Sequence, residues 1–161
     1  SALAAAVLLI ASGIGMGLCG MFTDWMGRKA VENKPTLGVI YCLGSCVLMM
    51  ISMRLPPGTG QFAMIIAGVF FAAGTYGTAG AMVTDLVHVS IHGTAIATLE
   101  LSSNLLGAAP GPYLTGLLAD SIGLLGALQW IPLVSIAAAL AFAFARTTYA
   151  RDLRRHEAAC R

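Results

Sequence analysis

The chain alternates between long apolar stretches and short charged or proline-rich segments. Asp, Glu, Lys and Arg are absent from residues 1–23, 35–53, 55–84, 86–99, 101–119 and 121–145. An α-helix of about 20 apolar residues crosses the hydrocarbon core of a bilayer, which is about 30 Å thick. Together with the proline and glycine positions, this pattern predicts five membrane-spanning helices, near residues 1–22, 37–53, 61–84, 94–118 and 123–145.

The composition indicates an all-α membrane protein. Hydrophobic residues make up 58% of the chain and charged residues 10%, whereas soluble domains carry roughly 25% charged residues. No segment has the alternating pattern of a barrel strand, and an isolated span satisfies its backbone hydrogen bonds in lipid only as a helix. The formal charge of +2 is too small to favour a nucleic-acid partner. We expect membrane lipid to surround the bundle.

Small residues predict where the helices contact one another. The chain has 19 glycines, and small residues let helices approach closely in lipid. In the first span, Gly13 and Gly17 have the spacing of a packing face. The third span carries a small, mildly polar stretch with Thr75 and Tyr76, which we expect to face other helices. The second and fifth spans lack such a stretch and are expected to meet lipid.

Lysine and arginine positions predict the orientation. Eight of the nine lie on the side of the carboxyl terminus, and only Arg54 lies on the other side. Because these residues concentrate in cytoplasmic loops, we expect residues 1–146 to form the transmembrane bundle and residues 147–161 a basic cytoplasmic tail. The first span starts outside without a signal sequence, so we expect the chain to be the later part of a longer protein.

The loop after the first span carries the most informative motif. It reads Gly20-Met21-Phe22-Thr23-Asp24-Trp25-Met26-Gly27-Arg28-Lys29. Gly20 permits close helix contact, Asp24 can face the positive amino end of a neighbouring helix, and Arg28 can pair with carboxylates. These features predict a breakable cytoplasmic latch formed by Gly20, Asp24, Gly27, Arg28 and Lys29. The alternative is an ordinary basic loop that only sets the orientation.

This motif resembles the G-x-x-x-D-[R/K]-x-G-R-[R/K] signature of the major facilitator superfamily, with Trp25 in place of the usual basic residue. In that family the signature lies between spans two and three, and a weaker copy lies between spans eight and nine. Four spans follow the motif here, so the resemblance implies spans eight to twelve of a twelve-span fold. The missing amino-terminal half of the same chain would then be a required partner.

The fourth span contains a predicted helix kink at Pro110, Gly111 and Pro112. It is similar to the family's eleventh span. Interrupted helices often line substrate paths, although a kink that serves packing alone is the alternative. The segment 85–120 also resembles bacterial members of the spinster-like branch, which implies a location in the bacterial inner (plasma) membrane.

Glu100 is the only charged residue inside a predicted span. A carboxylate in lipid is costly unless it pairs, meets water or takes up a proton. Together with Asn104 on the next turn, and with Thr75 and Tyr76, it forms a candidate proton or substrate path. Because Glu100 lies about two turns from the cytoplasmic end, contact with interfacial water or with a motif arginine is the alternative.

We expect no metal site, no cofactor and no enzymatic activity. Asp85, His88 and His92 could share a helix face, but no fourth ligand is close in the sequence. The glycines between Gly15 and Gly20 match a dinucleotide fingerprint only formally, because they lie inside an apolar helix rather than after a strand. No nucleophile is paired with a base.

The predicted function is secondary active transport of a small-molecule substrate by alternating access, as a symporter or an antiporter. Proton coupling is one option. A non-transporting helical subunit or scaffold of a larger complex is the alternative, and a membrane enzyme comes third. About seven further spans upstream, with a second copy of the motif, would favour transport.

Overall fold

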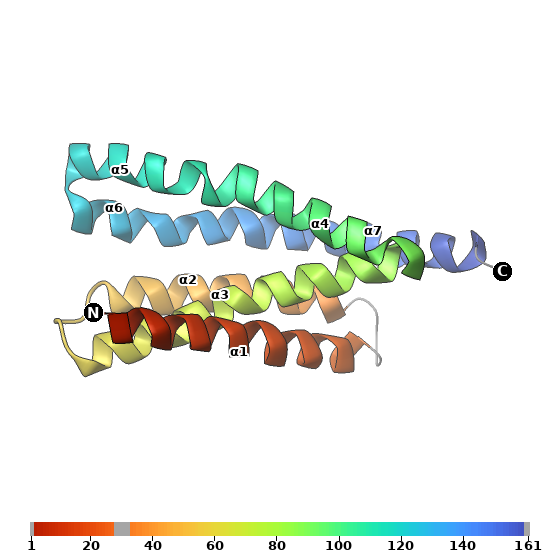
Figure 1. Ribbon diagram of the computed structural model, residues 1–161, viewed down its shortest axis with the longest axis horizontal. Helices are drawn as coiled ribbons and strands as arrows, with labels where there is room; N and C mark the ends of the chain where they lie inside the picture. Colours follow the sequence, from red (N-terminus) through yellow and green to blue (C-terminus); the bar gives the residue numbers. More distant parts are fainter. Residues whose placement is uncertain (1, 28–32, 160–161) are drawn as a thin grey trace.

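The computed structural model describes residues 2–27 and 33–159, and every element in this part of the chain is a helix. Five passes run along the bundle in alternating directions (Figure 1). The first three are the single helices α1 (Ala2–Gly27), α2 (Asn33–Ser52) and α3 (Thr59–Leu86). The predicted all-α fold is therefore confirmed for the described residues.

The last two passes are each made of several shorter helices. The fourth consists of η1 (Val89–Ile91), α4 (His92–Ser103), η2 (Asn104–Ala108) and α5 (Pro110–Ile122). The fifth consists of α6 (Leu124–Trp130), η3 (Ile131–Leu133) and α7 (Val134–Ala159). The helix α7 thus continues past residue 146, where we expected the bundle to pass into a tail.

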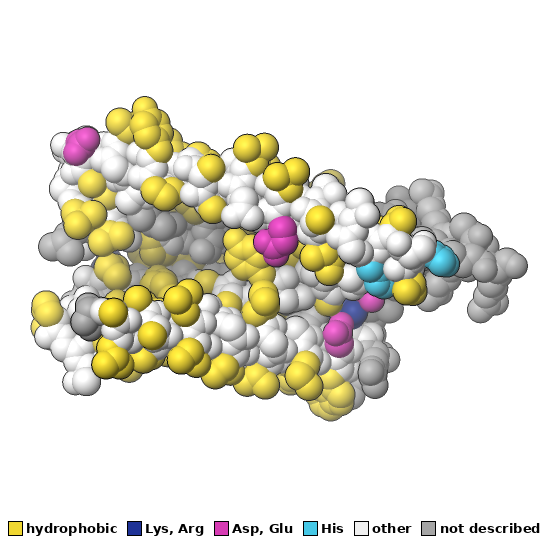
Figure 2. Space-filling model, in the orientation of Figure 1, with side chains coloured by type: hydrophobic (Ala, Val, Ile, Leu, Met, Phe, Trp, Pro, Cys, Tyr) yellow, Lys and Arg dark blue, Asp and Glu magenta, His cyan; other side chains and the backbone are white. Residues whose placement is uncertain are grey.

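Within the described part of the chain, four helical segments are long and apolar enough to cross a membrane: Ala2–Gly27, Asn33–Ser52, Thr59–Leu86 and Gly126–Tyr149. Large apolar side chains such as Leu9, Leu106 and Phe144 are exposed, and apolar atoms cover much of the visible face along the length of the bundle (Figure 2). Such a surface suits lipid and is unfavourable in water. The chain has the architecture of a multi-pass membrane-embedded protein.

The helices form two layers that meet at one end (Figure 1). The helices α1, α2 and α3 make one layer, α4 to α7 form a hairpin beside it, and α7 packs against α2. The layers approach each other where α3 leads into α4 and separate toward the turn between α5 and α6. We call the end where α1 ends, at Gly27, and α3 ends, at Leu86, the converging end.

Glycines allow α1 and α3 to pack backbone against backbone. A Cβ atom at Gly15 would lie 2.5 Å from the carbonyl oxygen of Phe70, and one at Gly77 would lie 2.6 Å from that of Met16. The predicted packing face at Gly13 and Gly17 meets no other described helix, because a Cβ at either position would meet nothing within 4 Å. The helix α3 instead contacts the neighbouring face of α1.

The expectation that the second span meets lipid holds for only one face of α2. The helix α2 has nine buried residues and packs against both α3 and α7. Its buried side chains include the small groups of Cys42, Ser45 and Cys46, while Leu43 and Val47 on another face are exposed. Two neighbouring helices therefore cover one side of α2, and only the other side is free to contact lipid.

The fourth pass is interrupted just before its prolines. Pro110 and Pro112 have no N–H group, so neither can donate a helical hydrogen bond. In the preceding turn, the N–H of Ala109 donates to the carbonyl of Asn104, five residues back, at 2.8 Å. This widened π turn accommodates the proline rings, which would otherwise clash with carbonyls one turn earlier.

The double variant Pro110→Ala and Pro112→Ala is expected to convert the fourth pass into a continuous α-helix. The restored N–H donors would replace the wide turn at Asn104–Ala108 with regular hydrogen bonds. Amide hydrogen exchange of residues 104–112 should then slow about tenfold, because local opening becomes rarer. Unchanged exchange would show that tertiary contacts, rather than the prolines, hold the π turn. Gly116→Ala, on the same pass with open space around the new methyl group, is the matched control.

Candidate functional site

Four polar side chains from four helices meet at the converging end. The Nζ atom of Lys34 lies 3.0 Å from Oδ1 of Asp24 and 2.6 Å from Oδ2 of Asp85. The hydroxyl of Tyr149 donates a hydrogen bond to the same Oδ2 atom of Asp85, at 2.5 Å. We call Asp24, Lys34, Asp85 and Tyr149 the Lys34 cluster. It joins α1, α2, α3 and α7, and Figure 2 shows acidic and basic side chains together at this end.

The motif residues of α1 build one wall of this cluster. Gly20, Asp24 and Gly27 follow one another at helical spacing and therefore lie on one face. Gly20 contacts the backbone of Gly77, Asp24 binds the ammonium group, and Gly27 leaves room for the aliphatic chain of Lys34. A Cβ atom at Gly27 would overlap Cε of Lys34. Close packing, charge and space for the lysine thus come from about two turns of one helix.

The electrostatics of the Lys34 cluster allow it to open. Lys34 is buried, and its single positive charge lies between two carboxylates, so its removal from water is offset by two ion pairs. The carboxylate partners are less enclosed, since the side chain of Asp24 is 55% exposed and that of Asp85 is 33% exposed. Water can therefore hydrate both acids when the helices separate, which makes the contact breakable.

The sequence named no residue as the partner of Asp24, and in the structure this partner is Lys34, in the first turn of α2. Arg28 and Lys29, which complete the predicted latch, lie outside the described residues. Lys34 was one of the eight basic residues that set the predicted orientation. No pairing was predicted for it or for Tyr149. A signal was available, because Asp24, Lys34 and Asp85 all lie at span ends on the same predicted side of the membrane. Charges that gather at one end of a bundle are candidates for mutual pairing.

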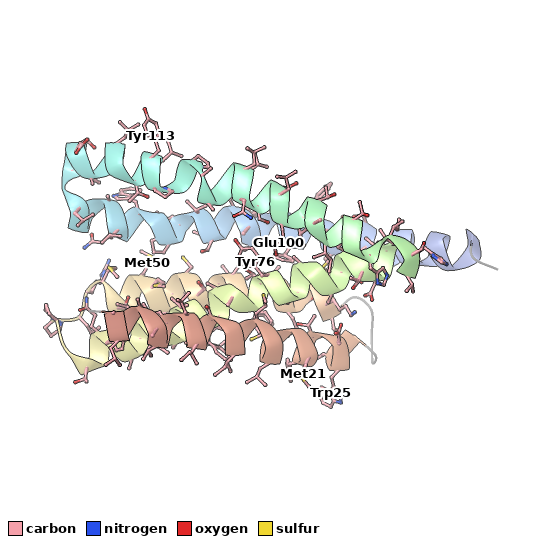
Figure 3. The ribbon with its side chains drawn as sticks, in the orientation of Figure 1. Met21, Trp25, Met50, Tyr76, Glu100 and Tyr113 are labelled. Atoms are coloured by element: carbon pink, nitrogen blue, oxygen red, sulfur yellow. The ribbon has the colours of Figure 1, made fainter. Side chains whose placement is uncertain are left out.

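Glu100 and Tyr76 line one open groove of about 540 Å³ between α1, α3 and α4. Figure 3 shows their side chains near each other in the space between α3 and α4. Gly20 and Asp24 also line the groove, so it reaches the Lys34 cluster. The remaining lining residues are Gly13, Met16, Gly17, Met21, Gly77, Gly80, Ala81, Thr84, Ile96 and Leu99.

The other two residues of the predicted path do not line this groove. The hydroxyl of Thr75 donates to the carbonyl of Ala72 at 2.7 Å, and the side-chain amide of Asn104 donates to the backbone carbonyl of Glu100 at 2.8 Å. Both polar groups therefore bond to their own helix. The structure brings Glu100 and Tyr76 together and leaves Thr75 and Asn104 outside their groove.

The kink residues lie at a second, mainly apolar cavity of about 430 Å³. Gly107, Pro110 and Gly111 line it from the fourth pass, and Trp130 and Val134 line it from the fifth. Pro112 is not among its lining residues. This cavity has no charged side chain among the residues that line it, so it offers apolar contact rather than a polar binding site.

Asp85, His88 and His92 have separate partners. Asp85 belongs to the Lys34 cluster, Nδ1 of His88 lies 3.0 Å from the hydroxyl of Ser90, and Nε2 of His92 lies 3.0 Å from the carbonyl oxygen of Val87. Among the residues that the structure describes, no group of three His, Cys, Asp or Glu side chains is arranged to hold a metal ion. The two histidines instead bond within the turn between α3 and α4.

The candidate functional site consists of the Lys34 cluster and the groove beside it. The Lys34 cluster joins four helices through two ion pairs and one hydrogen bond, and the adjoining groove provides a carboxylate beside an aromatic ring. Comparison with known proteins adds no family to this description: no protein-family model matches the chain, and no curated protein matches it either.

Proposed function

We propose that this chain is part of a secondary active transporter that moves a small solute by alternating access. In this proposal its five passes are spans eight to twelve of a major facilitator fold in a bacterial inner membrane. The observation that carries it is the Lys34 cluster, which ties four helices at one end of a bundle that opens toward the other end. A bundle that is closed by breakable contacts at one end suits a two-state transporter.

The Lys34 cluster acts as the latch of the state that is closed at the converging end. We assign this end to the cytoplasm, since the predicted basic loops lie there. Opening separates Lys34 from Asp24 and Asp85, and hydration of the partly exposed acids limits the cost of that step. The groove beside the latch, with Glu100 and Tyr76, then forms part of the solute path, and the chain carries no catalytic chemistry.

The variant Asp24→Asn tests the latch in the full-length protein that contains this sequence. Loss of one of the two ion pairs of Lys34 should lower the uptake rate about tenfold, because the closed state loses stability relative to the open one. Folding should be retained, since the pair with Asp85 remains. Uptake is measured in proteoliposomes with an imposed proton or sodium gradient.

The control is Asp120→Asn, which removes an exposed carboxylate from the far end of α5. It should leave the uptake rate unchanged. Equal rates for wild type and Asp24→Asn would reject the latch. A full-length protein that takes up no solute under any gradient, and that purifies only within a larger complex, would favour the scaffold instead.

A further inference from the structure

We propose that the Glu100 groove binds an organic cation with an apolar body. This inference rests on the proposed transport function and names its substrate class. The groove lies between three helices, and its volume of about 540 Å³ is within the range of small-molecule sites, about 300–1,000 Å³. Its lining combines a carboxylate that has no ion-pair partner among the described residues, one aromatic ring and bare glycine backbone, and each of these selects for part of such a solute.

The charged residues that line the groove favour a cationic solute. Asp24 and Glu100 are the charged lining residues of the groove among those that the structure describes, and none of the described Lys, Arg or His residues lines it. Asp24 is paired with Lys34, whereas no described side chain pairs with the carboxylate of Glu100. An anionic solute would meet net negative charge, and a neutral one would leave Glu100 without a counter-charge. A cation supplies the missing partner of the Glu100 carboxylate.

The aromatic ring of Tyr76, which lines the groove, also favours a cation. Tyr76 is half exposed, and its side chain lies beside Glu100 in the space between α3 and α4 (Figure 3). A cation over the face of such a ring is attracted by the electron density of the ring, most strongly where water is excluded. An ammonium or phosphonium group in this place would contact the carboxylate and the ring together.

The rest of the groove lining is mainly apolar and suits an apolar group on the solute. Met16, Ile96 and Leu99 line it, and the glycines add no side chains that would fill it. Methionine adapts its shape to different apolar groups. The wall therefore suits an apolar body attached to the charged centre, while a small inorganic cation would leave most of the volume without contacts.

Binding of two probes of matched shape and opposite charge tests this inference. The full-length protein is purified in detergent, and the dissociation constants of tetraphenylphosphonium and tetraphenylborate are measured by isothermal titration calorimetry. We expect the phosphonium to bind at least tenfold more tightly than the borate. Equal binding of both ions, or tighter binding of the borate, overturns the proposal, and this comparison needs no variant.

Variants then assign the binding to the groove. Glu100→Gln should weaken phosphonium binding at least tenfold, Tyr76→Leu should weaken it about threefold, and Tyr76→Phe should retain it because the ring remains. Asp120→Asn should leave it unchanged, since Asp120 lies on α5 and is not a lining residue. Unchanged binding in Glu100→Gln overturns the assignment.

The same assay separates this inference from the transport proposal. Phosphonium binding without uptake of any solute in proteoliposomes would reject transport and retain the cation site. Uptake of a solute by a protein that does not distinguish phosphonium from borate would retain transport and reject the cation site.

Discussion

Gly77→Ala is expected to separate α1 from α3 and to destabilise the bundle by about 2 kcal/mol, as overpacking of a tight contact does. The new methyl carbon would lie 2.6 Å from the carbonyl oxygen of Met16 and 3.2 Å from Cα of Gly20. Both obstacles are backbone atoms, so no side-chain rotation can relieve the clash. Reversible unfolding of the purified protein in mixed micelles, with increasing sodium dodecyl sulfate, gives the free energy of unfolding.

Gly80→Ala is the matched control, because Gly80 lies on the same helix and a Cβ atom there would meet nothing within 4 Å. Alanine also favours the helix over glycine by up to about 1 kcal/mol, so this variant should be neutral or slightly stabilising. If Gly77→Ala and Gly80→Ala unfold at the same detergent concentration, the close approach of α1 and α3 does not hold in the folded protein.

The number, type and order of the helical passes could be predicted from the sequence. Lipid leaves an isolated span no alternative to the helix, and proline and charged residues mark the ends of the spans. The predicted span 37–53 lies within a few residues of α2, and 61–84 lies inside α3. Such predictions depend only on local composition, which is why they succeed without knowledge of packing.

Which face of each helix contacts another could not be predicted. Gly13, Gly15 and Gly17 are identical in type, yet only Gly15 meets the backbone of α3 closely. In a soluble protein the apolar face points inward, but every face of a membrane helix is apolar. The sequence therefore shows that close packing occurs without showing where it occurs, and the burial of α2 was missed for the same reason.

The candidate site was only partly predictable, because pairing depends on distances between helices. The motif indicated Asp24 but named no residue as its partner, and the partner in the structure, Lys34, lies ten residues later at the start of the next helix. Glu100 was identified from its isolation in an apolar span. Its neighbour Tyr76 was one of several candidates, and only the crossing of α3 and α4 distinguishes it from Thr75.

Lys34→Met is expected to destabilise the protein by about 2 kcal/mol, with the loss concentrated at the converging end. Removing the cation leaves the carboxylates of Asp24 and Asp85 together without their shared partner. Breaking a fully buried pair costs about 3–5 kcal/mol, and the partial exposure of both acids reduces that figure here. Unfolding in mixed micelles measures this loss of free energy. The control is Arg54→Met, which removes an exposed cation between α2 and α3 and should change the free energy of unfolding by less than about 0.5 kcal/mol.

The double variant Lys34→Met and Asp85→Asn shows whether the loss comes from the ion pair. Once Asp85 is neutral, removal of Lys34 leaves only the more exposed Asp24 unpaired, so the double variant should be more stable than the sum of the two single changes predicts. A coupling of about 1 kcal/mol or more indicates a direct interaction between Lys34 and Asp85. Additive losses would mean that Lys34 does not act through Asp85, and its contribution would then come from the pair with Asp24 and from the packing of its aliphatic chain against Gly27.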